Sequence, residues 1–441
     1  MSEWKKVKLG ELYEVHNGLS KGRQFFGSGY PFLTFSDVFN NWFLPETLDS
    51  LVQSSDKERE ACSIKKCDVF ITRTSETMDE LGMSSVALKD YPDATYNGFT
   101  KRLRPITDEV VPEYIGYYLR SKKFRAKFMA FSSMTTRASL ANDDLLGMEV
   151  EIPDKTIQHR IATILSRYDT LIENYQKQIK LLEEAAQRLY KEWFVELRFP
   201  GHENTKMVDG LPEGWERKKL GELTSKFATG LNPRKNFVLG RGNNYYVTIK
   251  NMSNNDVAFD EKCDKVDDEA LEKINKRSDL QMGDLLFSGI GTIGRVYLID
   301  KPVTNWNISE SVFTMRPKPN IPSSFLYLVL LDKEIQDYCH SNAHGCAQKG
   351  IRMADLKAFE VLVPSQSVLY AFNNVTSNLI KQVKYKSSQI RLLTEARDRL
   401  LPRLMGGEME VDAPKGQRAI NPVHRSGYNP QTNHALKGQK N

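Results

Sequence analysis

The sequence predicts an α+β protein made of two tandem α/β globules, each followed by a long α-helix, with the two helices pairing with each other. Three observations support this fold class. The chain has 441 residues, about three times the length of an average domain. Blocks of sequence return at one constant spacing, and an apolar seam of helical period closes each copy.

An internal repeat sets the domain organisation. The segment Trp4-Lys-Lys-Val-Lys-Leu-Gly-Glu-Leu12 returns as Trp215-Glu-Arg-Lys-Lys-Leu-Gly-Glu-Leu223, a shift of 211 residues, and Leu181–Leu189 returns as Leu392–Leu400 with the same shift. Solenoid repeats have periods of about 20–50 residues, so this longer period indicates two copies of a whole domain with an appendage. The expected parts are a first globule 1–153, a first long helix 154–198, a linker 199–212, a second globule 213–364, a second long helix 365–406 and a disordered basic tail 407–441.

Strand and helix patterns are mixed within each globule. Period-two alternation is typical of half-buried strands, and proline near a helix start fits its fixed φ and missing N–H. The expected strands are 67–72 and 148–152 in the first copy and 283–288 and 359–363 in the second, and the expected helices are 112–131 and 322–338.

The apolar seam at the end of each copy predicts a long helix. In the first copy, apolar or small residues recur at alternating steps of four and three from Ile157 to Trp193, with one stutter, and the second copy keeps this register from Val368 to Leu404. About 40 residues at ~1.5 Å each make a rod of roughly 60 Å. Each helix could pack on its own globule alone, but two helices of this length at matching places favour mutual pairing.

Composition excludes several classes of protein. The 27% of charged residues are typical of a globular chain. The longest apolar run, Phe325–Leu331, is far shorter than the roughly 20 residues of a membrane-spanning helix, and no apolar segment follows the charged N-terminus as in a signal peptide. Five dispersed cysteines suit a reducing compartment. We therefore expect a cytoplasmic protein without membrane association.

Net charge alone does not indicate a DNA-binding protein. The chain carries a formal charge of +6, of which the tail 411–441 accounts for +4. A basic surface on the globules must therefore come from local clustering of lysine and arginine.

Two motifs are similar to cofactor or metal sites. Gly289-Ile-Gly-Thr-Ile-Gly294 matches the dinucleotide pattern GxGxxG, but the β-branched and apolar residues of Arg295–Ile299 predict a strand where such a site needs a helix. We interpret the motif as a glycine-rich turn between strands. Cys339-His340 and His344-Gly-Cys346 lack the paired spacing of a zinc knuckle. Walker and HExxH motifs do not occur in the sequence, so we expect no catalytic residue, metal site or cofactor on this chain.

Polar and cationic loops recur in both copies. Arginine, lysine, amide and hydroxyl groups beside glycine are the groups that contact base edges and phosphates. Any one such loop is more often an ordinary solvated loop, but several flank corresponding strands in both copies. The candidate DNA-binding residues are Lys21, Arg23, Arg73, Thr74, Asn97, Lys101, Arg137, Arg234, Lys235, Lys250, Asn251, Thr292, Arg295, Gln348, Lys349 and Arg352.

Four segments carry a resemblance to a known family. Leu211-Pro-Glu-Gly-Trp215, Lys219-Leu-Gly-Glu-Leu223, Tyr190-Lys-Glu-Trp-Phe-Val-Glu-Leu-Arg-Phe-Pro-Gly201 and Leu400-Leu-Pro-Arg-Leu-Met-Gly-Gly-Glu408 resemble the specificity subunit of type I restriction–modification enzymes. The resemblance spans residues 1–410, and the basic tail departs from it. It implies that each globule is a target recognition domain reading one half of a split DNA sequence. It also implies that the helices pair as an antiparallel coiled coil.

The resemblance implies a non-catalytic, sequence-specific DNA-binding subunit that recognises a bipartite target and directs other subunits to it. The implied partners are double-stranded DNA, two methyltransferase subunits and restriction or translocase subunits. S-adenosylmethionine, ATP and magnesium would be bound by those partners.

Three residues near the helix ends, Trp193, Phe194 and Leu404, are candidates to contact a partner, and the two aromatics could instead anchor the second helix. Three alternatives to the main hypothesis stay open. These are a modification-only system without a nuclease, a coiled-coil scaffold with no DNA role, and a nucleotide-dependent oxidoreductase based on Gly289–Gly294.

Overall fold

The computed structural model describes residues 4–75, 81–131, 138–139, 141–253, 255–345 and 348–409. The candidate Arg137 and residues 410–441 of the predicted tail lie outside these ranges. The chain divides into two compact units: the first unit comprises residues 1–163 and 401–441, and the second unit comprises residues 164–400. Each unit therefore contains one globule together with parts of both long helices.

The first unit is built on a four-stranded sheet of order β2-β9-β5-β7 and a three-stranded sheet of order β4-β3-β8. Strand β9 lies antiparallel to both β2 and β5. In chain order the elements are β1 Lys5–Lys8, α1 Leu9–Leu12, β2 Tyr13–Asn17, a 3-10 turn Arg23–Phe25, β3 Phe26–Leu33, α2 Phe35–Asn40, β4 Leu51–Val52, α3 Asp56–Ala61, β5 Val69–Thr72, β6 Thr74–Ser75, β7 Ser84–Val86, β8 Thr95–Tyr96, β9 Thr100–Pro105, α4 Pro112–Arg120, α5 Lys122–Phe131, β10 Ala138–Ser139, α6 Asn142–Gly147 and β11 Glu149–Ile152.

The second unit repeats this topology, with sheets of order β15-β23-β20-β21 and β19-β16-β22. The pair β14–β24 closes its globule as the pair β1–β11 closes the first. Its elements are the 3-10 turn His202–Asn204, β12 Met207–Val208, β13 Leu211–Pro212, β14 Glu216–Lys219, the 3-10 turn Leu220–Leu223, β15 Thr224–Thr229, β16 Asn244–Val247, β17 Met252–Ser253, β18 Asp256–Val257, β19 Asp264–Val266, α8 Asp268–Ser278, β20 Leu285–Ser288, β21 Val296–Leu298, β22 Trp306–Ile308, β23 Val312–Pro317, α9 Ser323–Leu331, α10 Lys333–Ser341, α11 Met353–Ala358 and β24 Glu360–Val363.

The expected single helix of each globule is in fact two helices. The break falls at Ser121 in the first unit and at Asp332 in the second, and both residues have extended backbone angles. Each side chain accepts a hydrogen bond from the following turn: Ser121 Oγ from the N–H of Phe124, and Asp332 from the N–H of Glu334. Serine and aspartate are favoured helix N-caps because they satisfy free N–H groups, so one residue at the same place in both repeats starts a new helix.

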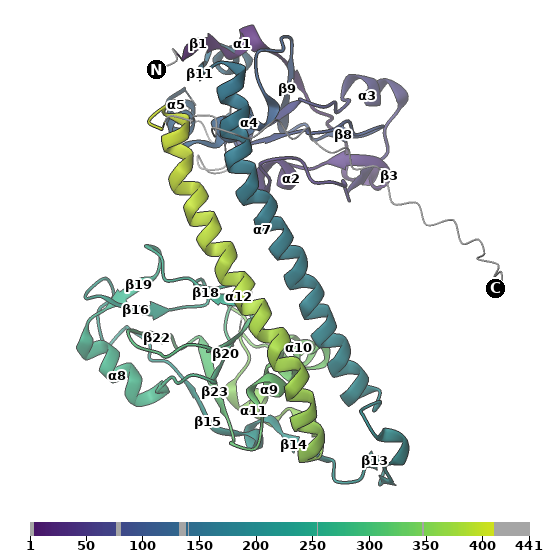
Figure 1. Ribbon diagram of the computed structural model, residues 1–441, viewed down its shortest axis with the longest axis vertical. Coiled ribbons are helices and arrows are strands. Elements are labelled where there is room, and N and C mark those ends of the chain that lie inside the picture. The colour runs from purple at the N-terminus through teal and green to yellow at the C-terminus, as the bar shows by residue number, and fades with distance from the viewer. Residues whose placement is uncertain are drawn as a thin grey trace, which may run out of the picture. The chain divides into compact units, whose positions relative to one another are not determined.

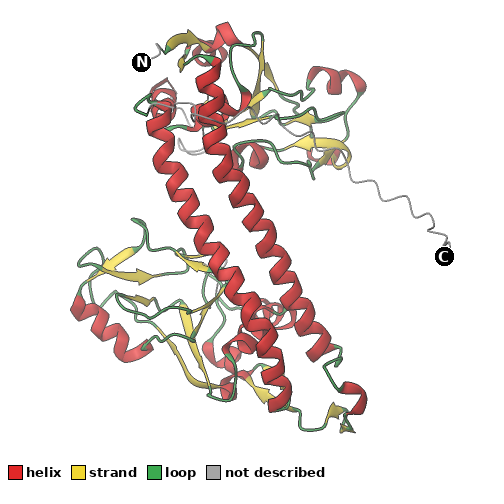
Figure 2. Ribbon diagram, in the orientation of Figure 1, coloured by secondary structure: helices red, strands yellow, loops and turns green. Residues whose placement is uncertain are grey.

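Both predicted long helices are present. The first is α7 (Lys155–Tyr190), which continues into a turn of π-helix at Lys191–Val195, and the second is α12 (Gln366–Met405). Figures 1 and 2 show both helices as continuous ribbons. Among the helices in the described part of the chain, none has the length and apolarity needed to span a bilayer.

Within the second unit, α7 and α12 pair antiparallel. The Asp169 carboxylate lies 2.6 Å from the Arg397 guanidinium, and the Phe194 and Phe372 ring centroids lie 4.6 Å apart. Residue numbers thus rise along α7 while they fall along α12. The prediction of mutual, antiparallel pairing is confirmed.

The segment Gly289–Gly294 is a turn and not a nucleotide-binding loop. It joins β20 to the antiparallel β21, in which Leu285 pairs with Leu298. Gly291 and Gly294 have φ of +85° and +94°, a region that favours glycine. The interpretation as a glycine-rich turn between strands is confirmed, and the oxidoreductase alternative loses its basis.

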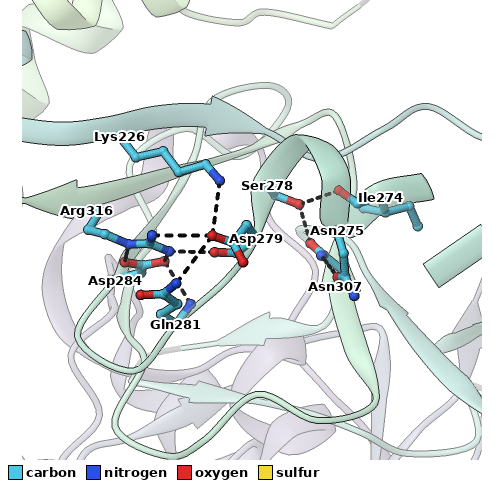
Figure 3. A network of polar contacts seen from close by, with 9 residues as sticks. All are labelled: Lys226, Ile274, Asn275, Ser278, Asp279, Gln281, Asp284, Asn307 and Arg316. Carbon is cyan, nitrogen blue, oxygen red and sulfur yellow. Dashed lines mark hydrogen bonds and ion pairs between the residues drawn. The ribbon is translucent and has the colours of Figure 1, made fainter. Parts of the chain in front are cut away.

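A buried ion pair recurs at the same place in both units. In the second unit, Arg316 on β23 donates to both carboxylate oxygens of Asp284, at 2.8 and 2.9 Å, and the Asp284 side chain is only 1% exposed (Figure 3). In the first unit, Arg104 on β9 donates to Asp68 at 2.8 and 2.7 Å. Each carboxylate also accepts a backbone N–H, from Gln281 or Lys65. The pair therefore fixes the turn before β20 or β5 to the central strand.

The residue before each buried aspartate has a positive φ, +93° at Gly283 and +73° at Cys67. We expect Gly283→Ala to lower the free energy of unfolding by about 1–2 kcal/mol, because a Cβ in this region strains the backbone. A Cβ at Gly283 meets no atom closer than 3.6 Å, so packing adds little to that cost. Urea unfolding measures the change. Cys67→Ala is the control, because Cys67 already carries a Cβ at a positive φ, so this substitution should change the free energy of unfolding less. Equal losses of stability in Gly283→Ala and Cys67→Ala would contradict the strain argument.

Candidate nucleic-acid interface

Three loops of the second unit start at one edge of its sheets. Strands β15 and β20 are both antiparallel to β23, and both end where β23 begins, with Thr229 opposite Phe313 and Ser288 opposite Val312. Strand β16 ends nearby, because the carbonyl of its last residue, Val247, accepts the N–H of Ser309, just before β23. The loops after β15, β16 and β20 therefore begin side by side.

Backbone hydrogen bonds hold a fourth segment, residues 348–352, against the glycine-rich turn. The N–H of Gly291 donates to the carbonyl of Lys349 at 2.8 Å, and the N–H of Ile351 donates to the carbonyl of Gly289 at 2.9 Å. The structure thus brings together candidates that lie about 100 residues apart in the sequence. The exposed candidates on these segments are Lys250, Thr292, Gln348, Lys349 and Arg352.

Two other candidates in this cluster are turned into the protein. Arg295 donates from its guanidinium to the carbonyls of Ile249 and Met252, at 2.8 and 2.6 Å. The Asn251 side chain is buried and accepts hydrogen bonds from the backbone N–H and the hydroxyl of Thr248, at 2.9 and 3.0 Å. In this structure both side chains shape the loop that presents Lys250.

The loop after β15 carries the exposed pair Arg234 and Lys235. Its base is fixed by a close backbone approach, because a Cβ at Gly230 would lie 1.7 Å from the Ile308 carbonyl oxygen. The Asn232 amide also donates to the Glu310 carboxylate at 2.6 Å. Only glycine fits at position 230, so the cationic loop leaves the sheet in a defined direction.

The first unit has an equivalent edge. Strands β2 and β5 end where the antiparallel β9 begins, with Asn17 opposite Lys101 and Thr72 opposite Thr100. The loop after β2 carries Lys21 and Arg23, the residues after β5 are Arg73 and Thr74, and Asn97 comes just before β9.

Backbone contacts join these segments. The N–H of Arg73 donates to the Phe99 carbonyl and the N–H of Gly98 donates to the Leu19 carbonyl, both at 2.9 Å. The Asn97 side chain accepts the N–H of Phe99 at 2.7 Å. Arg23 is exposed, and Arg73 is half-buried with its guanidinium 3.5 Å from the Asn17 side-chain oxygen. Arg73 and Asn97 are therefore gathered at this edge, and the loop that carries Arg23 begins there.

Two lysines predicted for the first interface instead contact side chains within the first unit. The Lys21 ammonium lies 2.8 Å from the Glu58 carboxylate, and this hydrogen bond with that of Ser55 lowers the pKa of Glu58 to about 2. Lys101 is 4% exposed and donates to the Asn142 side chain. Burial and the nearby Arg73 lower the pKa of Lys101. Thr74 lies on β6, and its side chain lies outside what the structure describes.

The loop after β16 is also tied to the first long helix, within the second unit. Asn255 has a φ of +63°, donates from its amide to Glu183 of α7, and accepts the hydroxyl of Tyr327 of α9. These residues line a cavity of about 420 Å³. Burial raises the pKa of Glu183, and the Asn255 amide opposes this. The helix therefore positions the loop that bears Lys250.

The helix-end candidates lie in the chain's own core, which leaves little of the two aromatics exposed for a direct partner contact. Trp193 and Phe194 are 7% and 4% exposed and pack on Phe372 of α12. They anchor the second helix, which is the other role considered for them. Leu404, in the first unit, is 2% exposed and likewise buried.

Sequence reasoning missed two features, one at the interface and one at the opposite end of the sheet. One is the dipeptide Gly-Leu, at Gly18-Leu19 and again at Gly230-Leu231, which starts the cationic loop after β2 and β15. Its shift of 212 residues, one more than the main repeat, is a signal that a residue-by-residue comparison of the two copies could have found. The other is the ion pair Asp68–Arg104, which gives no local pattern because its partners lie 36 residues apart.

Comparisons with known proteins agree with this architecture. A family model for the type I restriction modification DNA specificity domain matches residues 1–184 and 212–383. The chain is 26% identical over 429 residues to the type I restriction enzyme MjaIX specificity subunit of Methanocaldococcus jannaschii, covering 93% of this chain and 94% of that one. It is 24% identical to the HindI specificity subunit of Haemophilus influenzae, covering 93% and 100%.

A solved structure supports the fold. The crystal structure of the type I restriction-modification system S subunit from M. genitalium matches with a TM-score of 0.58 and 16% identity, over 91% of this chain and 96% of that one. Both repeats match the family model, and the matched ranges cover most of the sequence. The chain therefore belongs to the family of the type I restriction modification DNA specificity domain.

Proposed function

We propose that this protein is the DNA-recognition subunit of a type I restriction–modification system, in which each globule reads one half of a bipartite duplex target. The observation that carries the proposal is that both units have an equivalent strand edge, while the loops at that edge differ in sequence between the two units. Arg73 and Asn97 gather at this edge in the first unit, where the loop that carries Arg23 begins, and Lys250 and Lys349 gather there in the second. Equivalent scaffolds with different side chains suit two different half-sites.

The proposed partners follow from the names of the relatives, which are specificity subunits of type I restriction enzymes. We propose that two methyltransferase subunits and restriction subunits assemble on this chain. S-adenosylmethionine, ATP and magnesium belong to those partners in this proposal. Genomic DNA as the target implies a cytoplasmic protein that works away from the membrane. Among the described residues, no group of three or more histidine, cysteine or acidic side chains could hold a metal ion.

The test is a map of methylated adenines in the host genome, with and without this chain. The proposal expects one bipartite motif that disappears when the chain is deleted, and persistence of that motif would contradict it. A modification-only system would give the same map but no cleavage of unmethylated DNA by the complete complex. A DNA-free scaffold would give no sequence-specific gel shift when combined with the methyltransferase subunit.

Replacing Lys250 and Lys349 together by alanine is expected to weaken DNA binding uniformly across sequences. The plot of log K against log salt has a negative slope, and each phosphate contact that is lost makes this slope shallower by about 0.9. The slope of the double variant should therefore be shallower by about 2. Filter binding by the assembled complex at several salt concentrations measures this.

Lys318→Ala is the matched control for these two lysines. Lys318 is exposed and follows the opposite end of β23, away from the proposed interface. Its removal should leave the slope unchanged. An unaltered slope in the double variant would remove Lys250 and Lys349 from the phosphate-binding surface.

A further inference from the structure

We propose that Phe99 is a wedge that inserts its ring between neighbouring base pairs of the first half-site, an inference that rests on the proposed DNA-recognition function. Phe99 is 56% exposed and occupies the turn between β8 and β9. This turn lies at the edge where Arg73 and Asn97 gather. A large apolar ring at such a place has no role in the core of the globule.

Hydrogen bonds hold the backbone of this turn. The N–H of Phe99 donates to the Asn97 side chain at 2.7 Å, and its carbonyl accepts the N–H of Arg73 at 2.9 Å. The preceding N–H, of Gly98, donates to Leu19 at 2.9 Å. The backbone on both sides of Phe99 is thus hydrogen-bonded to other loops, so the exposed ring is carried by an ordered turn. Such a backbone needs little further ordering when the ring binds.

The surroundings of Phe99 suit duplex DNA better than an apolar partner surface. Arg73 contacts the same turn through its backbone, and Arg23 is exposed on the loop after β2. Phe26, at the end of that loop, is 39% exposed and lines one hollow together with Asn97. Proteins that kink DNA combine cations on the phosphates with an apolar side chain pushed into a base step. Cations and exposed rings are combined here.

The second unit lacks the ring at the equivalent turn. In the second unit the N–H of Gly289 donates to the carbonyl of Ser311, and in the first unit the N–H of Arg73 donates to the carbonyl of Phe99. A second pair of hydrogen bonds matches in the same way: the N–H of Ser309 donates to the carbonyl at the end of β16, and the N–H of Asn97 donates to the carbonyl at the end of β3. Ser311 therefore takes the place of Phe99. The proposal predicts a local opening of the DNA in the first half-site, with no counterpart in the second.

The experiment uses the complete methyltransferase complex and a duplex containing its mapped target. The fluorescent adenine analogue 2-aminopurine replaces single bases in turn, and the adenine that becomes methylated is left unsubstituted. Unstacking by the ring should raise the fluorescence at one step of the first half-site. Phe99→Ser, which copies the second unit, should abolish this rise and weaken binding about tenfold, whereas Phe99→Leu should retain part of both.

Ile106→Ser is the matched control. Ile106 is also 56% exposed, but it follows the opposite end of β9. It should change neither fluorescence nor affinity. A wild-type complex that binds its target specifically without any unstacked step would overturn the wedge and leave the proposed function intact.

Two other results separate the remaining possibilities. If Phe99→Ser prevents assembly with the methyltransferase subunit in light scattering, the ring contacts a protein and the wedge proposal is wrong. If the wild-type complex shows no sequence-specific binding at all, the proposed function itself fails.

Discussion

Replacing Phe194 by alanine is expected to lower the free energy of unfolding of the second unit by about 3–5 kcal/mol, the usual cost of removing a buried aromatic ring. Phe194 is 4% exposed, and its ring centroid lies 4.6 Å from that of Phe372 and 5.3 Å from that of Phe325. It thus joins α7 to α12 and to the globule. Urea unfolding followed by tryptophan fluorescence measures the loss, since Trp193 and Trp215 pack in the same cluster.

The neighbouring residue provides the control. Val195 belongs to the same helical turn but is 56% exposed, so Val195→Ala should change stability by less than about 0.5 kcal/mol. If Phe194→Ala proved equally mild, the packing of the two helices at this end would contribute little, and the antiparallel pair would depend on other contacts.

The second large effect concerns the repeated ion pair. Arg316→Ala is expected to destabilise the second unit by about 3–5 kcal/mol, because it leaves the buried Asp284 carboxylate without its partner. Arg316 also donates to the Asp279 carbonyl at the end of α8, so the helix loses an anchor as well (Figure 3). Chemical denaturation of the purified chain measures the loss.

Lys226→Ala tests whether the removal of any positive charge from this network would destabilise the second unit as much as Arg316→Ala does. Its ammonium lies 3.6 Å from Asp279, and both groups are partly exposed, which limits the contribution to about 0–1 kcal/mol. Arg104→Ala should reproduce the Arg316 effect in the first unit, since Asp68 is fully buried. Similar small losses in all three variants would show that the buried pairs are energetically neutral.

The long helices could be predicted from the sequence to within three residues, when the π-helical turn Lys191–Val195 is counted with α7. Their apolar seam runs for about 40 residues, so single interruptions do not hide the helical period. The break at Ser121 depends on one capping side chain in an otherwise helical pattern, which periodicity does not detect. The strand order of the sheets, in turn, depends on pairings between distant segments such as β2 and β9.

The candidate site was predicted at the level of loops but not of side chains. The loops after corresponding strands do gather in each unit, because the strands beside each central strand end at its first residues. Whether a cation faces outward depends on partners far away in sequence. Lys101 meets Asn142, and Arg295 meets Ile249, pairs separated by 41 and 46 residues. Residue type and local spacing carry no information about such partners.

The second unit contains residues from both sequence repeats, and this limits the positions at which segments of related specificity subunits can be exchanged. The core of the second unit includes Trp193 from the first repeat's helix, and Asn255 in its loop after β16 is held by Glu183 of the same helix. If residues 213–364 of a relative replaced those of this chain, the grafted globule would lose the relative's own counterparts of Trp193 and Glu183. Crossovers near residues 164 and 400, the limits of the second unit, would instead transfer a recognition module with its core intact.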